Sequence, residues 1–215
     1  VSDTTISFLA ASYGPVSVGS PAMTGTVASA VGGYTLTGTG ADVGGKDDQF
    51  LFNSQRRSGD FDVQVKLASL TPADAWSKAG LMAREDLSTG GAFAAVWAAP
   101  SMVGSYFEFR ALAGVVTARM GSAAVNYPAT WLRLRRAGSW FSSYTSFDGV
   151  NWTPLGGTNL SLPEELHFGL ALCSHQTNVP ATAVFQDLTE ASGTGLGRLP
   201  AVVESLGPCS RRTGL

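Results

Sequence analysis

The residues best suited to chemistry alternate along one short segment. In Tyr106-Phe107-Glu108-Phe109-Arg110 the polar residues occupy every second position. Successive side chains of an extended strand point to opposite faces of a sheet. We therefore expect Tyr106, Glu108 and Arg110 to share one face, with both phenylalanines in the core. An aromatic ring beside planar polar groups is the usual lining of a sugar-binding surface, so the segment predicts a glycan-binding face.

Three further residues could join this face. Arg84 follows Ala79, Leu81 and Ala83, which would form the core side of their strand and leave Arg84 on the polar side. Trp97 could supply an aromatic platform in an open groove, and His175 could project from a strand end. The alternative is structural: an Arg–Glu network on a sheet face, a buried tryptophan and a hydrogen-bonded histidine. The candidate ligand-binding residues are Arg84, Trp97, Tyr106, Glu108, Arg110 and His175.

A glycine-rich loop contains Asp42, Asp47 and Asp48. Carboxylate and carbonyl oxygens are the ligands of calcium, so this loop could wrap a Ca²⁺ ion. The favoured alternative is that these aspartates form Asx turns that cap the loop. No Cys/His cluster has zinc spacing, and we expect no other cofactor.

The acidic residues do not fit a glycoside hydrolase. Such enzymes use two carboxyl groups that flank the scissile bond, and glucanases built on β-sandwiches place them in a Glu-x-Asp-x-x-Glu strand. That order does not occur here, and neither does a Gly-x-Ser-x-Gly nucleophile turn. We therefore expect no catalytic residues and no enzyme activity.

Short strands must position all these residues. Apolar residues alternate at period two between turn signals, and helical period is almost absent apart from one turn near Trp76. Residues up to Pro21 could add an edge strand. About a dozen strands at short spacing are typical of an antiparallel sandwich. The predicted strands cover residues 33–38, 48–52, 61–67, 79–84, 92–98, 106–111, 115–120, 132–135, 140–145, 167–174 and 182–188.

The clearest local signal is Ser146-Phe147-Asp148-Gly149-Val150-Asn151-Trp152. Asp-Gly between two alternating runs predicts a tight hairpin, because glycine accepts positive φ. The order Ser-x-Asp-Gly-x-x-Trp resembles the Asp-box hairpin of sialidases and many secreted β proteins. Where it occurs, that motif is structural.

Composition excludes several partners. A net charge of −2 with 14% charged residues gives no electrostatic footprint for nucleic acid or an anionic membrane. The longest apolar runs are too short to insert into a bilayer. Scarce lysine and abundant Gly, Ser and Thr favour a secreted or cell-surface setting, with the chain a mature or excised piece. The spacing of Cys173 and Cys209 leaves open whether they form a disulfide.

Four stretches, in this order, resemble a known family: Gly40–Phe50, Trp76–Glu85, Trp131–Arg136 with the Asp-Gly hairpin, and Gly169–His175. They are similar to concanavalin A-like, laminin-G-like jelly-roll domains of large secreted bacterial proteins, often labelled "regulation of enolase". The resemblance implies an all-β, two-sheet antiparallel jelly-roll sandwich, placed within residues 1–191. Residues 192–215 would be a linker and tail, similar at the end to the lead-in of lamin-tail-like domains, with a further domain beyond.

Three functions remain in competition. The favoured one is a non-catalytic, lectin-like carbohydrate-binding module of a larger secreted protein. The second is a structural or adhesive surface domain that spaces other domains or self-assembles, with Ile6–Ala10 as a candidate pairing segment. A hydrolase with an unusual carboxylate pair is the least favoured. The expected partners are accordingly a glycan or neighbouring protein domains.

Overall fold

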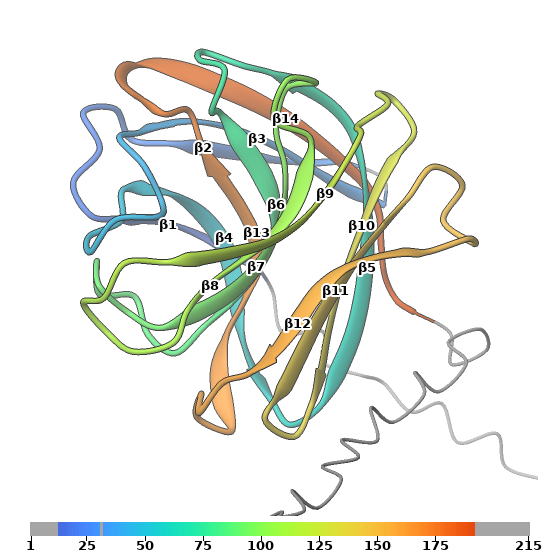
Figure 1. Cartoon of the computed structure of the whole chain (residues 1–215). Helices are drawn as coiled ribbons and strands as arrows, with labels where there is room; N and C mark the ends of the chain where they lie inside the picture. Colours follow the sequence, from blue (N-terminus) through green and yellow to red (C-terminus); the bar gives the residue numbers. More distant parts are fainter. Residues whose placement is uncertain (1–12, 31, 192–215) are drawn as a thin grey trace, which may run out of the picture.

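The computed structural model describes residues 13–30 and 32–191, which form a two-sheet antiparallel sandwich (Figure 1). Sheet A has the order β1 (Gly14–Val18), β4 (Phe50–Ser58), β13 (Glu165–Cys173), β6 (Lys78–Arg84), β7 (Phe93–Ala98), β8 (Ser105–Arg110) and β9 (Ala118–Ala123). Sheet B has the order β12 (Thr153–Asn159), β11 (Trp140–Ser146), β10 (Thr130–Ala137), β5 (Phe61–Thr71), β14 (Gln176–Glu190), β3 (Gly33–Gly40) and β2 (Thr26–Ala30).

This architecture confirms the predicted jelly-roll, concanavalin A-like sandwich. The described residues contain no helix, and so none that could cross a membrane. The expected helical turn near Trp76 is an irregular turn, in which the Trp76 amide donates to Asp74 Oδ1 at 2.8 Å. The segments 1–12 and 192–215 lie outside the described residues, and so do the predicted pairing segment, Cys209 and the linker and tail.

The main core lies between the two sheets and follows the predicted alternation. On β5, Phe61, Val63, Val65 and Leu67 are buried while the residues between them are partly exposed. The facing side of sheet A contributes the residues predicted for it, which include Ala79, Leu81, Ala83 and Phe107. Burial of these apolar side chains is the main source of stability for such a sandwich.

A second apolar layer covers the other face of sheet A. It contains Phe50, Phe52, Phe93, Trp97 and Tyr106, all buried. Strands β6 and β7 are consequently buried at every position. Period-two alternation describes a sheet with one wet face, so it could not predict that this sheet is covered on both sides.

Two strand predictions need correction. The strand expected at residues 115–120 lies at Ala118–Ala123, because the preceding loop is held away from the sheet: Arg110 Nε donates to Val115 O at 2.8 Å, and Thr117 N to Gly44 O at 3.1 Å. Strand β2 was not predicted, and β12 was implied only as the second arm of the predicted Asp-Gly hairpin. β12 begins with Thr153-Pro154 and contains two adjacent glycines, a composition that usually argues against a strand.

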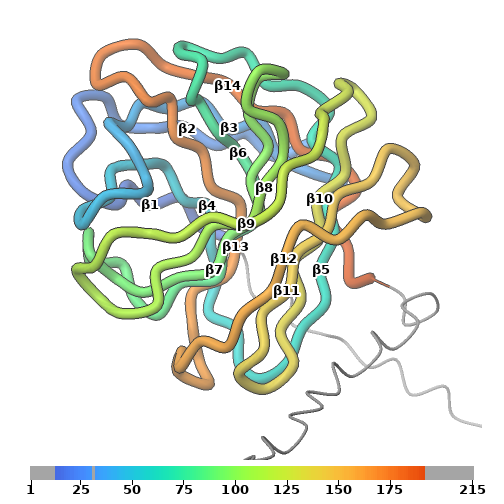
Figure 2. Tube along the Cα trace, in the orientation of Figure 1, coloured from blue at the N-terminus to red at the C-terminus, as the bar shows by residue number. Residues whose placement is uncertain are grey.

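The outermost strands β9 and β12 belong to different sheets and lie against each other (Figure 2). Their approach is so close that a Cβ at Gly121 would lie 2.1 Å from the carbonyl oxygen of Leu155. Gly121 also has a φ of 70°, which other residues rarely adopt. Glycine at this position therefore allows the two sheet edges to meet.

The Asp-Gly hairpin joins β11 to β12 as predicted, with Gly149 at a φ of 72°. Asp148 organises the turn: its Oδ1 accepts from Val150 N at 2.8 Å and from Asn151 N at 2.7 Å, and its Oδ2 accepts from Asn151 Nδ2 at 2.7 Å. Ser146 Oγ donates to Asp148 Oδ1 at 2.8 Å. The hairpin is therefore rigid although it lies at the surface.

These hydrogen bonds make the hairpin sensitive to acid. Donation by the Asn151 amide and side chain holds the pKa of Asp148 far below its ordinary value of 3.8. A carboxyl group with a lowered pKa contributes stability above its unfolded-state pKa and loses it as the pH falls. We expect Asp148→Asn to reduce the loss of stability on acidification below about pH 4, measured by urea unfolding at several pH values. An unchanged pH profile would contradict this role.

Candidate ligand-binding site on the outer face of sheet A

Three loops, here called the loop cap, cover the outer face of sheet A. Backbone hydrogen bonds join them: Gly114 N donates to Gly90 O at 2.9 Å, and Thr117 N donates to Gly44 O at 3.1 Å. The apolar layer on sheet A lies beneath these loops, which explains its burial. The loop cap consists of residues 41–48, 85–92 and 111–117.

Asp48 attaches the loop cap to the sheet through two arginines. Its Oδ2 accepts from Arg84 Nη1 at 2.7 Å and from Arg110 Nη1 at 2.6 Å, while its Oδ1 accepts from Arg110 Nη2 at 2.6 Å. All three side chains are fully buried. Burial lowers the pKa of Arg84 despite the neighbouring carboxylate. The triad is thus one carboxylate between two buried guanidinium groups.

The predicted open groove is therefore wrong. Arg84, Trp97 and Arg110 are 0% exposed, because the loop cap fills the space above them. Alternation placed these residues on the correct face, but Trp97 packs in the core and cannot act as a platform. The structural alternative was right for Trp97, but Arg84 and Arg110 pair with the loop residue Asp48 and not with a glutamate.

A second cluster lies beside the triad and reaches the edge of the loop cap. Lys78 Nζ donates to Asp42 Oδ1 at 2.8 Å and lies 3.9 Å from Glu108 Oε2. Glu108 Oε1 accepts from Arg119 Nε at 2.9 Å and from Thr117 Oγ1 at 2.9 Å. Burial would lower the pKa of Lys78, but nearby Tyr106, Glu108 and Asp42 outweigh it and leave that pKa raised. Lys78 therefore stays charged.

The three loop aspartates do not converge on a metal position. Asp42 binds Lys78, Asp48 binds the two arginines, and Asp47 Oδ1 accepts from Thr89 Oγ1 at 2.8 Å. Within residues 13–30 and 32–191, no group of three or more His, Cys, Asp or Glu side chains is arranged to hold a metal ion.

The accessible part of this face lies around Trp76 and Arg119. Trp76 is 46% exposed, and the Arg119 guanidinium lies 5.6 Å from its ring centre and 4.7 Å from that of Tyr106. Two adjoining hollows share this pair, and we call them the Trp76 hollows. One, of about 340 Å³, is mainly apolar and is also lined by Met102, Val103, Tyr106 and Gly121. The other, of about 250 Å³, is also lined by the charged side chains of Asp42 and Lys78 and by His175.

Three predicted residues thus lie in or beside the Trp76 hollows. Tyr106 contributes its ring, and burial raises the pKa of its hydroxyl to about 12. His175 lines the smaller hollow, with Nδ1 at 3.1 Å from Asp74 Oδ1, and it has a φ of 57° just after β13. Glu108 is fully buried, and it positions Arg119 from below.

Sequence reasoning missed Trp76 and Arg119 as site residues. Arg119 is paired across the β8–β9 register with Glu108. Opposite charges at directly facing strand positions are a recognisable pairing signal, but only once that register is known. Trp76 belongs to an irregular turn, where no periodicity shows which way a side chain points.

No family model and no curated protein matches the chain. The assignment to the "regulation of enolase" domains therefore receives no support beyond the motifs quoted for it. Solved structures do match. A functionally unknown protein from Saccharomyces cerevisiae is similar at a TM-score of 0.64 and 15% identity, over 84% of this chain and 97% of that one.

Two other similar structures come from Bacillus species. The carbohydrate-binding module CBM66 from Bacillus subtilis has a TM-score of 0.53 and 21% identity, over 84% of this chain and 97% of that one. The GH43 protein BlXynB from Bacillus licheniformis has a TM-score of 0.55 and 15% identity, over 72% of this chain but only 32% of its own length. At such low identity these likenesses establish the shared sandwich fold.

Proposed function

We propose that this chain is a non-catalytic carbohydrate-binding module that acts outside the cell, with the Trp76 hollows as its sugar-binding site. The observation that carries the proposal is the exposed Trp76 ring held against Arg119 between two hollows, one mainly apolar and one with charged side chains in its lining. Sugars present an apolar ring face and hydroxyl edges, and they are bound by an aromatic surface with a few fixed polar groups. The shared fold with CBM66 agrees with this proposal.

The charges around the hollows favour a neutral sugar. Lys78 is paired with Asp42, and Arg119 is paired with Glu108. Neither sign is in excess, so an anionic glycan would find no unpaired cation among these four side chains. Paired charges hold their carboxylate and guanidinium groups in fixed directions, which suits hydrogen bonding to pairs of hydroxyl groups.

The same pairing argues against glycoside hydrolysis at this site. Hydrolysis needs one carboxylic acid that is still protonated when it meets the substrate. Burial would raise the pKa of Asp42, but Lys78 outweighs burial and holds that pKa below its usual range. Glu108 is fully buried and accepts hydrogen bonds from Arg119 and Thr117. Asp42 is therefore not suited to donate a proton, and Glu108 Oε1 is already engaged by two donors.

Trp76→Ala tests the site. We expect binding to neutral polysaccharides to weaken about thirtyfold or more, because truncating a central aromatic contact typically costs at least about 2 kcal/mol of binding energy. Binding would be measured by affinity electrophoresis and calorimetry with xylan, mannan, cellulose and starch fragments. Arg119→Ala should weaken binding too, since it removes the group that holds the indole ring.

Trp140→Ala is the matched control. Trp140 is 40% exposed on β11 of sheet B, away from the hollows. It should leave sugar binding unchanged. Equal losses in both tryptophan variants would indicate non-specific adsorption. No binding by the unaltered chain across a broad array of plant, algal and microbial glycans would overturn the proposal.

A further inference from the structure

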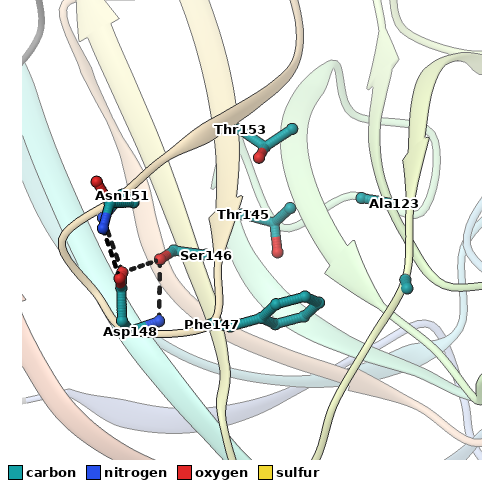
Figure 3. Close-up of a pocket in the computed structure, with 8 residues that line it drawn as sticks. Ala123, Thr145, Ser146, Phe147, Asp148, Asn151 and Thr153 are labelled. Atoms are coloured by element: carbon teal, nitrogen blue, oxygen red, sulfur yellow. Dashed lines mark hydrogen bonds between the residues drawn. The ribbon is translucent and has the colours of Figure 1, made fainter.

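A third hollow, of about 360 Å³, lies at the Asp-Gly hairpin, and we call it the hairpin hollow (Figure 3). The proposed function does not use it. Its wall includes Phe147, which is 52% exposed at the turn. Figure 3 shows the Phe147 ring on the same side of the hairpin as the side chains of Thr145 and Thr153, the side that faces Ala123 of β9.

Some polar groups of this hollow already form hydrogen bonds within the protein, and others can still bind a ligand. Both oxygens of Asp148 accept hydrogen bonds within the turn, and Ser146 Oγ accepts from Asp148 N and Gly149 N. Thr145 Oγ1 donates its proton to Trp131 O at 3.0 Å, so it can still accept. Thr153 is exposed at the start of β12. Its hydroxyl can therefore donate and accept.

The lining also limits the charge of an occupant. No Lys, Arg or His lines the hairpin hollow, so an anionic ligand would find no countercharge there. The one carboxylate, Asp148, is fixed by the turn, and Figure 3 shows it on the opposite side of the hairpin from the Phe147 ring. Besides Asp148 and Asn151, the lining presents an aromatic ring with neutral hydroxyl groups.

The turn is built to hold this ring in place. Its backbone is fixed by the hydrogen bonds to Asp148 and Ser146. Gly149 is also confined, because a Cβ there would lie 3.0 Å from the Trp131 ring. An exposed aromatic ring on a rigid turn loses little conformational entropy when it binds, which favours affinity.

From these observations we infer that the hairpin hollow is a second sugar-binding site, in which a neutral sugar unit stacks on Phe147 and hydrogen-bonds to Thr145 and Thr153. The ligand class rests on the proposed function, but the hollow itself is separate. Strand β9 connects the two places: Gly121 lines a Trp76 hollow and Ala123 lines the hairpin hollow. Two residues of a strand span about 7 Å, so nearby units of one glycan chain can occupy both.

The test is a titration of the ¹⁵N-labelled chain with neutral hexaoses (xylo-, manno-, cello- and malto-hexaose), followed by amide chemical shifts. We expect two groups of shifted amides, one near Trp76 and Arg119 and one at residues 145–153. Phe147→Ala should remove the second group and weaken that site at least tenfold. Phe147→Leu, which keeps an apolar side chain and removes the aromatic face, should do the same.

Val150→Ala is the control, because Val150 is 75% exposed in the same turn but does not line the hollow. It should behave like the unaltered chain. Shifts near Trp76 without shifts at residues 145–153 would overturn this inference and leave the proposed function standing. If the amide shifts at residues 145–153 persist in Trp76→Ala, they support a separate site at the hairpin. If only these amides shift in the unaltered chain, the proposed site at the Trp76 hollows is overturned and the hairpin site stands. No shifts anywhere would overturn both.

Discussion

Asp48→Asn should lower the free energy of unfolding by about 3–5 kcal/mol, the usual cost of removing one partner from a buried ion pair. Asp48 is the carboxylate between Arg84 and Arg110, and all three side chains are fully buried. Asparagine has nearly the same shape but no charge. Two guanidinium groups would then remain buried without their carboxylate, and the loop cap would lose its attachment to sheet A.

Guanidinium unfolding followed by tryptophan fluorescence would measure this effect, provided that the transition is two-state. Asp47→Asn is the control, since Asp47 is exposed and interacts with Thr89 Oγ1. Its effect should stay within about 0.5 kcal/mol, as for most surface substitutions. If the two variants lose the same stability, the buried triad does not attach the cap as we infer.

Gly80→Ala should destabilise the sandwich by about 2–3 kcal/mol, as other insertions into a packed interior do. Gly80 lies in the middle of β6, between β13 and β7. A Cβ there would lie 1.9 Å from the carbonyl oxygen of Val96. That atom is part of the backbone of β7 and cannot rotate away, so the two strands would have to separate locally.

Gly14→Ala is a matched strand-glycine control. Gly14 lies on the edge strand β1, and no atom lies within 4 Å of the position its Cβ would take. The change should be below about 1 kcal/mol and towards stabilisation, because alanine restricts the unfolded chain. Denaturation midpoints of the two variants would be compared directly. A Gly80→Ala midpoint equal to that of Gly14→Ala would show that β6 and β7 have room to move apart.

The sequence allowed the fold class and the facing of side chains to be predicted, because both depend on local alternation. Phe107 points into the core while Tyr106, Glu108 and Arg110 point to the other face, as expected. The alternation of apolar and polar residues at every second position also located most strands to within a few residues. Local patterns are sufficient for such properties because each strand's side-chain direction depends on its own backbone.

The exposure of those side chains could not be predicted. Whether Arg110 binds a ligand or Asp48 depends on where the loop of residues 41–48 folds, and these two residues are 62 positions apart. The candidate site likewise combines a turn residue, Trp76, with a residue of β9, Arg119. Contacts between distant segments depend on packing, and no single-segment pattern records them. The location outside the cell stays a prediction.

The hollow shared by Tyr13 and Glu190 places the start of β1 and the end of β14 at one end of the sandwich. The strand register puts Trp76 at the other end of the sandwich. His167 pairs with both Arg84 and Arg56, at the end where Tyr13 and Glu190 lie. Lys78, two residues after Trp76, pairs with Cys173, six residues further along β13. Six residues of strand span roughly 20 Å. Any partner that contacts the sandwich at Tyr13 and Glu190 would thus leave the Trp76 hollows, at the opposite end, accessible to ligand.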